Sequence, residues 1–236
     1  MSVRARALVP VFDGRGYLEH GTYAVKGKRI DMNTLLIATV RTNDELRPLV
    51  EEIRMTVASD LKLVISSSRE SVAINVNRGL NSAEGDFILK VDDDITGFQR
   101  GWDLKLIEPM QQDPMIGAVA ARLLNKDGSV QLTCSRDVNM HPAWLVTDRP
   151  IVPFCCVAFR NDGTRMDERY IGSGYDDGDF CNQLRVKIPH VKFAIHNEVR
   201  VIHKHEQKNA QLNRNALLFR EKWTGVAFAD GKGVVE

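Results

Sequence analysis

Residues 77–94 read NRGLNSAEGDFILKVDDD, and this stretch decides the fold. Its second half, DFILKV at 86–91, is an apolar run of strand length that leads directly into Asp92, Asp93 and Asp94. Short continuous apolar runs are typical of buried parallel strands, and open α/β sheets bind ligands at the carboxyl ends of such strands. The stretch therefore predicts an α/β fold with an acidic ligand-binding edge.

Strands and helices are expected to alternate on both sides of this stretch. TLLIATV at 34–40 and LKLVIS at 61–66 are further apolar runs. Between them, Thr42 to Glu45 carries capping residues ahead of apolar positions at helical spacing, although Pro48 requires that helix to begin late or to bend. The other expected elements are helices at 77–85 and 176–187 and strands at 116–123, 152–159, 192–196 and 199–203.

The first residues differ from the rest of the chain. Residues 1–32 hold short alternating stretches broken by Asp13-Gly14 and Gly27, so we expect a small N-terminal β appendage there. Residues 33–236 then form one α/β domain, and 43% hydrophobic residues in the chain are enough to fill its core.

The bulk composition argues against several functions. The chain has 32 Lys and Arg and 31 Asp and Glu, so a net charge of +1 gives no general attraction for nucleic acid or an anionic membrane. We find no signal-peptide h-region and no apolar run near the roughly 18 residues of a membrane span. The four cysteines lack C-x-x-C spacing, which favours reduced thiols. These features predict a soluble, cytoplasmic protein.

The aspartate run is a candidate metal site. Adjacent carboxylates repel one another and cost desolvation unless a cation lies between them, and hard oxygen ligands suit Mg²⁺ or Mn²⁺. The other interpretation is a solvated acidic turn. The motifs on either side of the aspartate run favour a metal site over a solvated turn.

The run at 77–94 resembles glycosyltransferase family 2, in which an N-x-G-l-x-x-A-x-G segment precedes the strand that bears the DXD motif. Residues 166–185 are similar to the family's DE-x-F and ED-x-D-F-c-x-R region, with Asp176 in place of the usual Glu. FREKW at 219–223 is similar to the family's F-x-x-K-W ending. The resemblance covers about residues 33–223. It implies the GT-A fold, a Rossmann-like mixed sheet flanked by helices that nucleotide-diphospho-sugar transferases share.

The resemblance also implies roles for the carboxylates of the second block. Asp177 would be the general base that deprotonates an acceptor hydroxyl as it attacks the anomeric carbon, and direct displacement would invert that carbon. Asp176 would assist as a second catalytic carboxylate, and Asp179 would bind acceptor hydroxyls. A carboxylate near a helix N-terminus can also be simply stabilising.

A metal held by the aspartate run and a histidine is implied in the same way. His203 ends a late strand where many family members supply a histidine, and imidazole is a good Mn²⁺ ligand. His205 is the alternative, two residues further on. The expected ligands are Asp92, Asp94 and His203, and the expected ion is Mn²⁺ or Mg²⁺.

A nucleotide-sugar donor would lie at the carboxyl edge of the sheet. Thr39 and Arg41 occupy the family's base-binding segment, with Ala38 where Pro is usual, and Ser67 stands where an Asp often contacts the nucleobase. The favoured donor is a UDP-sugar. The expected donor-binding residues are Thr39, Arg41, Ser67, Asn77, Gly79, Asp92, Asp93 and Lys222.

The sequence leaves the acceptor open among a glycan, a lipid-linked glycan and a macromolecule. Loops at 95–115 and 124–150 are expected to select it, and Trp102, Trp144 and His141 could form a sugar platform there, although buried aromatics are common. The expected acceptor-binding residues are Asp179, Trp102 and Gly174.

Three alternatives stay open. A retaining GT-A transferase ranks second, because many of these carry D-x-H where this chain has aspartate at 92, 93 and 94. A nucleotidyltransferase would use the same carboxylates for two-metal phosphoryl transfer. A non-catalytic binding protein is disfavoured by the presence of all three blocks.

Overall fold

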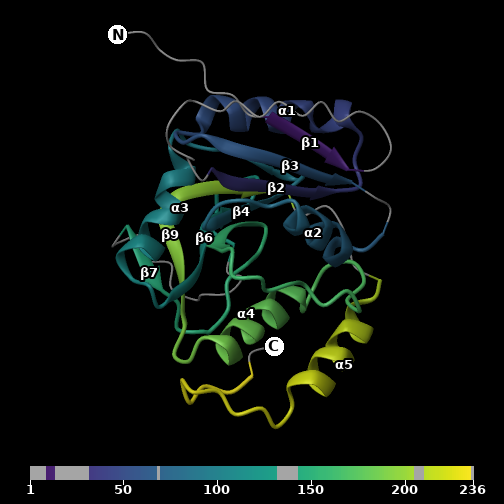
Figure 1. Cartoon of the computed structure of the whole chain (residues 1–236), viewed down its shortest axis with the longest axis vertical. Helices are drawn as coiled ribbons and strands as arrows, with labels where there is room; N and C mark the ends of the chain where they lie inside the picture. The colour runs from purple at the N-terminus through teal and green to yellow at the C-terminus, as the bar shows by residue number, and fades with distance from the viewer. Residues whose placement is uncertain (1–8, 14–31, 68–69, 132–142, 205–209, 235–236) are drawn as a thin grey trace.

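One mixed β-sheet with helices on both faces carries the fold of the computed structural model, which confirms the expected fold class (Figure 1). The structure describes residues 9–13, 32–67, 70–131, 143–204 and 210–234. Within these ranges no helix is both long and apolar enough to cross a bilayer.

In the described ranges the sheet has nine strands. They are β1 (Val9–Asp13), β2 (Asn33–Thr39), β3 (Leu61–Ser67), β4 (Phe87–Asp92), β5 (Ile95–Thr96), β6 (Ile116–Leu124), β7 (Trp144–Val146), β8 (Cys156–Arg160) and β9 (Lys192–His203). Their order is β1-β3-β2-β4-β8-β6-β9-β5, with β7 also paired to β9. The first four strands of that order are parallel, whereas β8 is antiparallel to both of its neighbours.

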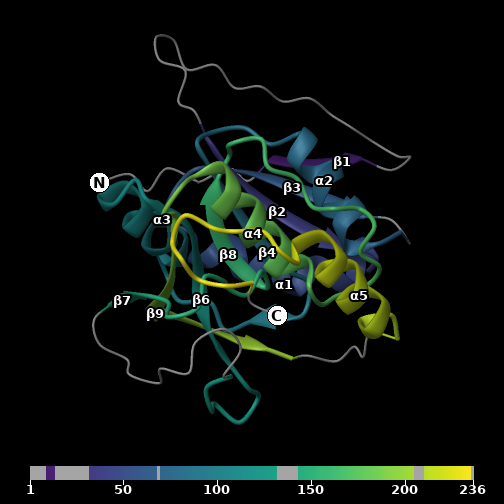
Figure 2. The same ribbon diagram turned by 90° about the horizontal axis from the view of Figure 1, so that it is seen from below.

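The helices of the described residues are α1 (Asn43–Thr56), α2 (Val72–Asn81), α3 (Trp102–Gln112), α4 (Asp176–Lys187) and α5 (Leu212–Trp223). The first four cover the two faces of the sheet in pairs. α1 and α3 pack on the face that holds Leu35 and Leu89, and α2 and α4 pack on the face that holds Leu36 and Ile88. Because both faces are covered, the central strands β2, β4 and β6 are buried along nearly their whole length instead of alternating between buried and exposed residues. Figure 2 shows α4 and α5 in front of the sheet when the molecule is seen from below.

The helix expected at 77–85 lies several residues earlier in the chain. α2 starts at Val72 behind Ser71, whose Oγ accepts the Ile74 N–H at 3.3 Å, and it ends at Asn81. α1 likewise begins at Asn43, ahead of Pro48, instead of starting late. In both cases a side chain that caps the first turn sets where the helix begins.

The two strands expected at 192–196 and 199–203 form one strand, β9. Its register against β6 jumps from His196 to Arg200 while β6 advances only from Ala121 to Arg122, so the residues between form a bulge. The bulge bends the strand without ending it.

The stretch at 95–115 was expected to be an acceptor loop, but it contains β5 and α3. Trp102 opens α3 and is 0% exposed, with its ring centroid 4.8 Å from that of Phe98. A buried ring offers no surface to an acceptor, so the structure corrects the predicted role of Trp102 to core packing. His141 lies outside the described residues.

Part of the expected N-terminal appendage belongs to the main sheet. β1 runs parallel to β3 at its edge, with Val9 opposite Lys62 and Asp13 opposite Ser66. Residues 1–8 and 14–31 lie outside the described ranges. The division of the chain at residue 32 stays a prediction.

Candidate active site

The carboxyl ends of β2, β3 and β4 meet at one edge of the sheet, as parallel strands require. Thr39 lies beside Ser67 in the register of β2 with β3, and Ala38 lies beside Asp92 in the register of β2 with β4. Thr39, Ser67 and Asp92, which were predicted separately for the donor site, are therefore neighbours on this edge.

Asp93 connects the aspartate turn to the end of β2. Its carboxylate accepts a hydrogen bond from the Thr39 hydroxyl and pairs with Arg41 Nε at 3.4 Å. The Arg41 backbone N–H in turn donates to Thr39 Oγ1 at 2.9 Å. Burial raises the pKa of Asp93, while the Thr39 hydrogen bond and the Arg41 charge oppose that rise. Hydrogen bonds and an ion pair thus join the predicted base-binding segment to the aspartate run.

Asp94 lies beside His203 because β5 pairs with β9, with Ile95 opposite His203. The His203 Nε2 is 3.5 Å from an Asp94 carboxylate oxygen, and His203 Nδ1 is 3.1 Å from Gln131 Oε1. Gln131 uses its amide N–H to bond the His203 carbonyl at 3.0 Å, so its Oε1 is an acceptor and His203 Nδ1 carries the proton. His203 Nε2 then faces the Asp94 carboxylate.

The second acidic group comes from the first turn of α4. Asp176 accepts the Gly174 N–H at 2.7 Å, and Asp177 Oδ2 accepts the Phe154 N–H at 3.0 Å. Gly174 has φ of 101° and Tyr175 has φ of 69°, so the chain turns sharply into the helix through the left-handed region. This conformation is strained for Tyr175, and such strain is concentrated at functional sites.

The protonation of this acidic pair is shifted toward the neutral forms. Burial raises the pKa of Asp176. Burial and the charge of Asp176 raise the pKa of Asp177 to about 8, against the opposing charge of Lys90. A carboxylate poised near neutral pH is suited to general-base catalysis.

The aspartate turn and the start of α4 both lie close enough to Cys155 for their charges to act on its thiol. The Asp92 backbone N–H donates to the Cys155 carbonyl at 2.7 Å. Burial, followed by the charges of Asp92 and Asp177, raises the pKa of the Cys155 thiol, and Asp94 adds to that rise. The predicted metal side and the predicted base therefore flank the same region, although they are far apart in the sequence.

Lys90 lies between these two acidic groups and was not among the predicted site residues. Its side chain is 3% exposed, and its ammonium donates to Asp92 and to the Phe154 carbonyl. The signal that could have revealed it is a lysine within an otherwise apolar strand, because a buried charge requires a partner.

The chemistry of Asp94 and His203 fits a divalent metal, because a carboxylate and an imidazole suit Mn²⁺. Across the described part of the chain, no three His, Cys, Asp or Glu side chains already converge as a metal site. Mg²⁺ and similar ions commonly take only one or two protein ligands and complete their shells with water and substrate phosphate. The arrangement therefore fits an ion bound together with a nucleoside diphosphate.

Two residues predicted for the donor site make packing contacts. Asn77 is 8% exposed, and its side chain exchanges two hydrogen bonds, both of 2.9 Å, with the Met166 backbone. A Cβ atom at Gly79 would lie 2.0 Å from Leu36 Cδ1, so α2 packs on β2 through this glycine. These contacts explain both residue types without a ligand, and donor binding by either residue stays a prediction.

Lys222 and Asp179, predicted for the donor and the acceptor, are bonded to each other. Lys222 Nζ lies 2.7 Å from Asp179 and 2.9 Å from Asp167. Asp179 is 1% exposed and also accepts the Trp223 Nε1–H at 2.8 Å. The described contacts of the pair thus link α5 to α4.

The variant Lys222→Met tests this linking role. It should lower the free energy of unfolding by about 2–3 kcal/mol, because Asp179 would be buried without its counter-ion while the partial exposure of Lys222 moderates the cost. Urea denaturation measures the change, and Lys105→Met, which removes an exposed pair with Glu198, should change it by at most about 0.5 kcal/mol. Unchanged stability together with a large loss of nucleotide affinity would instead favour donor binding by Lys222.

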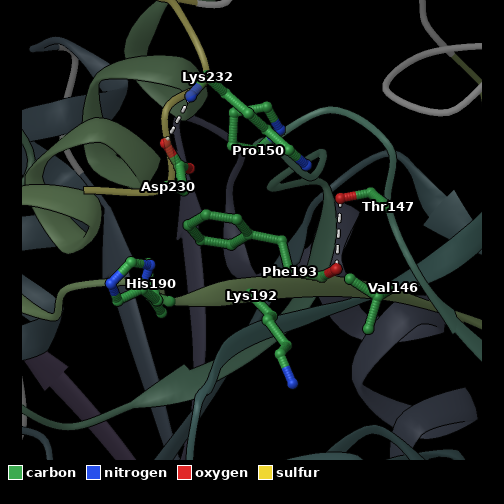
Figure 3. A pocket seen from close by; sticks show the side chains of 9 residues that line it. Val146, Thr147, Pro150, His190, Lys192, Phe193, Asp230 and Lys232 are labelled. Atoms are coloured by element: carbon green, nitrogen blue, oxygen red, sulfur yellow. Dashed lines mark hydrogen bonds between the residues drawn. The ribbon is translucent and has the colours of Figure 1, made fainter. Parts of the chain in front are cut away.

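A cavity of about 180 Å³ lies between β7, the start of β9 and the C-terminal residues (Figure 3). Pro150 and Phe193 are among its lining residues. The Asp230 carboxylate at its rim accepts the Lys232 backbone N–H at 3.0 Å and pairs with Arg185 at 2.9 Å. The lining residues, all within the described ranges, include none of the predicted site residues, and we assign no ligand to the cavity.

Comparison with known proteins defines the fold as the GT-A fold and the class of protein as a glycosyltransferase. A family model described as glycosyl transferase family 2 matches residues 17–162, which is more than half of the chain. The chain therefore belongs to glycosyl transferase family 2. A search of curated proteins finds no match.

Two solved structures share the fold at low sequence identity. One is GalNAc-T7 crystallised with UDP, GalNAc and Mn²⁺, which is 12% identical, with a TM-score of 0.62 over 84% of this chain and 49% of that chain. The other is a mycobacterial protein, also 12% identical, with a TM-score of 0.55 over 80% of this chain and 75% of that chain. This chain thus spans about half the length of the GalNAc-T7 chain, and both similarities concern the fold alone.

Proposed function

We propose that this protein transfers a sugar from a nucleotide-sugar donor to an acceptor hydroxyl with the help of Mn²⁺ or Mg²⁺, and that the anomeric carbon is inverted. The observation that carries the proposal is the meeting of two acidic groups around Lys90 and Phe154. One group is the Asp92–Asp94 turn beside His203, and the other is the first turn of α4.

The donor nucleotide would lie along the edge formed by β2, β3 and β4. Thr39, Ser67 and Asp93 are neighbours there, and Arg41, which pairs with Asp93, supplies a positive charge. Asp94 and His203 would hold the ion at the diphosphate. A bound ion would stabilise the negative charge that develops on the departing nucleoside diphosphate.

Asp177 would act on the acceptor side as the general base. Its carboxylate is oriented by the Phe154 N–H, and it would take the proton of the acceptor hydroxyl as that oxygen bonds to the anomeric carbon. The bond from the anomeric carbon to the diphosphate oxygen breaks on the opposite side, which inverts the configuration. Asp176, held by Gly174, would orient a sugar hydroxyl.

A UDP-sugar is the favoured donor. The co-crystallisation of GalNAc-T7 with UDP and Mn²⁺ supports this preference through the shared fold. Ser67, in place of a carboxylate, removes a group that would read a pyrimidine, so other bases belong in the test. The acceptor class stays open among a glycan, a lipid-linked glycan and a macromolecule.

A thermal-shift screen against UDP-, GDP-, CDP- and dTDP-sugars, with and without Mn²⁺, tests the proposal. A ligand present at about 100 times its Kd adds roughly 2.7 kcal/mol of stability. In a domain of this size that corresponds to an increase in Tm of about 5–10 °C. We expect the largest increase for a UDP-sugar with Mn²⁺ and little for either component alone. No increase with any nucleotide sugar would contradict the proposal.

Product analysis separates the remaining alternatives. Slow hydrolysis of the stabilising donor, followed by NMR of the released sugar, should give the inverted anomer first. The retained anomer would favour a retaining transferase. Release of pyrophosphate from a labelled nucleoside triphosphate would favour a nucleotidyltransferase.

A further inference from the structure

Lys90 is a buried charge in the centre of the sheet. It lies on β4, with Leu36 of β2 and Val157 of β8 as its register neighbours. Because side chains alternate along a strand, Lys90 points to the same face as Ile88 and Asp92, which is the face that α4 covers. A side chain at this position reaches toward the start of α4.

The contacts of Lys90 join the two acidic groups through a single residue, Phe154. Its ammonium bonds an Asp92 carboxylate oxygen and, at 2.6 Å, the Phe154 carbonyl oxygen. The backbone N–H of the same residue, Phe154, donates to Asp177 Oδ2 at 3.0 Å. The chain of contacts therefore runs from Asp92 through Lys90 and Phe154 to Asp177.

We propose that Lys90 is a positioning residue that fixes the distance and orientation of the catalytic base Asp177 relative to the metal-side carboxylate Asp92. The inference rests on the proposed function and adds a residue to it. Lys90 touches neither donor nor acceptor in this scheme, and its ammonium bonds Asp92 and the Phe154 carbonyl.

The charge of Lys90 also compensates the acidic residues around it. Its side chain is 3% exposed, and its ammonium pairs with the Asp92 carboxylate on the same strand. Asp176 is buried and Asp177 is partly buried, and both lie close enough to Lys90 for its charge to favour their ionised forms. A cation built into the strand thus stabilises the acidic group before any ligand binds.

This double role predicts opposite effects on metal binding and on turnover. Removing the ammonium leaves the carboxylates less neutralised, so Lys90→Met should bind Mn²⁺ about tenfold more tightly at pH 8 in the presence of UDP. The same change removes the hydrogen bond to the Phe154 carbonyl, so Phe154 and the Asp177 carboxylate that it orients should become more mobile. We therefore expect kcat to fall about 10–100-fold, as for other residues that orient catalytic groups. A residue with a merely structural role would lower the amount of active protein without tightening metal binding.

Three variants and two measurements test the inference. The concentration of free Mn²⁺ is measured by electron paramagnetic resonance while Mn²⁺ is titrated into protein with UDP. Donor turnover is measured at saturating Mn²⁺. Lys90→Arg keeps the charge and should keep Mn²⁺ affinity within about threefold of wild type, with a kcat between those of wild type and Lys90→Met. Lys105→Met, which removes an exposed lysine on α3, should change neither quantity.

The outcomes distinguish this inference from the proposed function. A folded Lys90→Met protein with unchanged or weaker Mn²⁺ binding, or with turnover within twofold of wild type, would overturn the positioning role. If the wild-type protein itself neither binds Mn²⁺ with UDP nor turns over any nucleotide sugar, the proposed function fails, and this inference fails with it. Tighter Mn²⁺ binding together with slower turnover would support it.

Discussion

Asp177→Asn should lower the rate of sugar transfer by about 10²–10⁴-fold, the usual contribution of a general base. Asparagine keeps the size of the side chain and an oxygen that can accept the Phe154 N–H, so the backbone around it should keep its geometry. It cannot accept the proton of the acceptor hydroxyl. Donor and metal affinity, measured by calorimetry with UDP and Mn²⁺, should stay within about threefold of wild type, because Asp177 contacts neither in the proposed scheme.

The pH dependence of the wild-type protein provides an independent check on Asp177. The base acts in its ionised form, and burial raises its pKa to about 8, so kcat/KM should fall as the pH drops below the raised value. The acid limb should thus lie above the ordinary carboxyl range. The control Asp113→Asn removes a partly exposed carboxylate that pairs with Lys192 and should retain the wild-type rate and profile. Wild-type transfer by Asp177→Asn would remove Asp177 from the mechanism.

The strands and the position of the acidic edge could be predicted from the sequence because their cause is local. Apart from Lys90, β4 is apolar from Phe87 to Val91 because both of its faces are covered, and that requirement is visible in a short window. Asp92, Asp93 and Asp94 follow the strand directly, so their place at the edge follows from its end. The start of α4 at Asp176 was also predicted correctly, because three aspartates in the first turn are favourable there.

Contacts between segments far apart in the chain could not be predicted from the local sequence. Lys90 meets Phe154 only because β8 lies antiparallel beside β4, and no local pattern contains that pairing. The burial of Trp102 depends on how α3 packs against the sheet, which residue type alone does not determine. Lys222 was assigned to the donor from its motif, whereas its position against Asp179 follows from the docking of α5 on α4. Each difference concerns a partner brought in by tertiary structure.

Asp94→Ala should have an effect comparable to that of Asp177→Asn, but for a different reason. The proposed ion stabilises the leaving diphosphate by several kcal/mol, and each 1.36 kcal/mol corresponds to about a tenfold change in rate, so loss of the ion should slow transfer by roughly 10³-fold. Removing free metal from the wild-type protein with EDTA should have the same effect, and added Mn²⁺ should reverse it. In the variant, excess Mn²⁺ should restore only part of the rate, because one of the proposed carboxylate ligands is missing.

A variant of His203 can be compared directly with Asp94→Ala, because both residues are proposed to hold the ion. Gln131 fixes the proton on Nδ1 and leaves Nε2 facing Asp94, so the imidazole is oriented for a metal before one binds. His203→Gln should raise the Mn²⁺ concentration needed for half-maximal activity about 10–100-fold, with a smaller change in the maximal rate than Asp94→Ala, because a neutral ligand stabilises the ion less than a carboxylate does. If both variants and the EDTA-treated wild-type protein transfer sugar at the untreated rate, the carboxylates of the Asp92–Asp94 turn act without a metal.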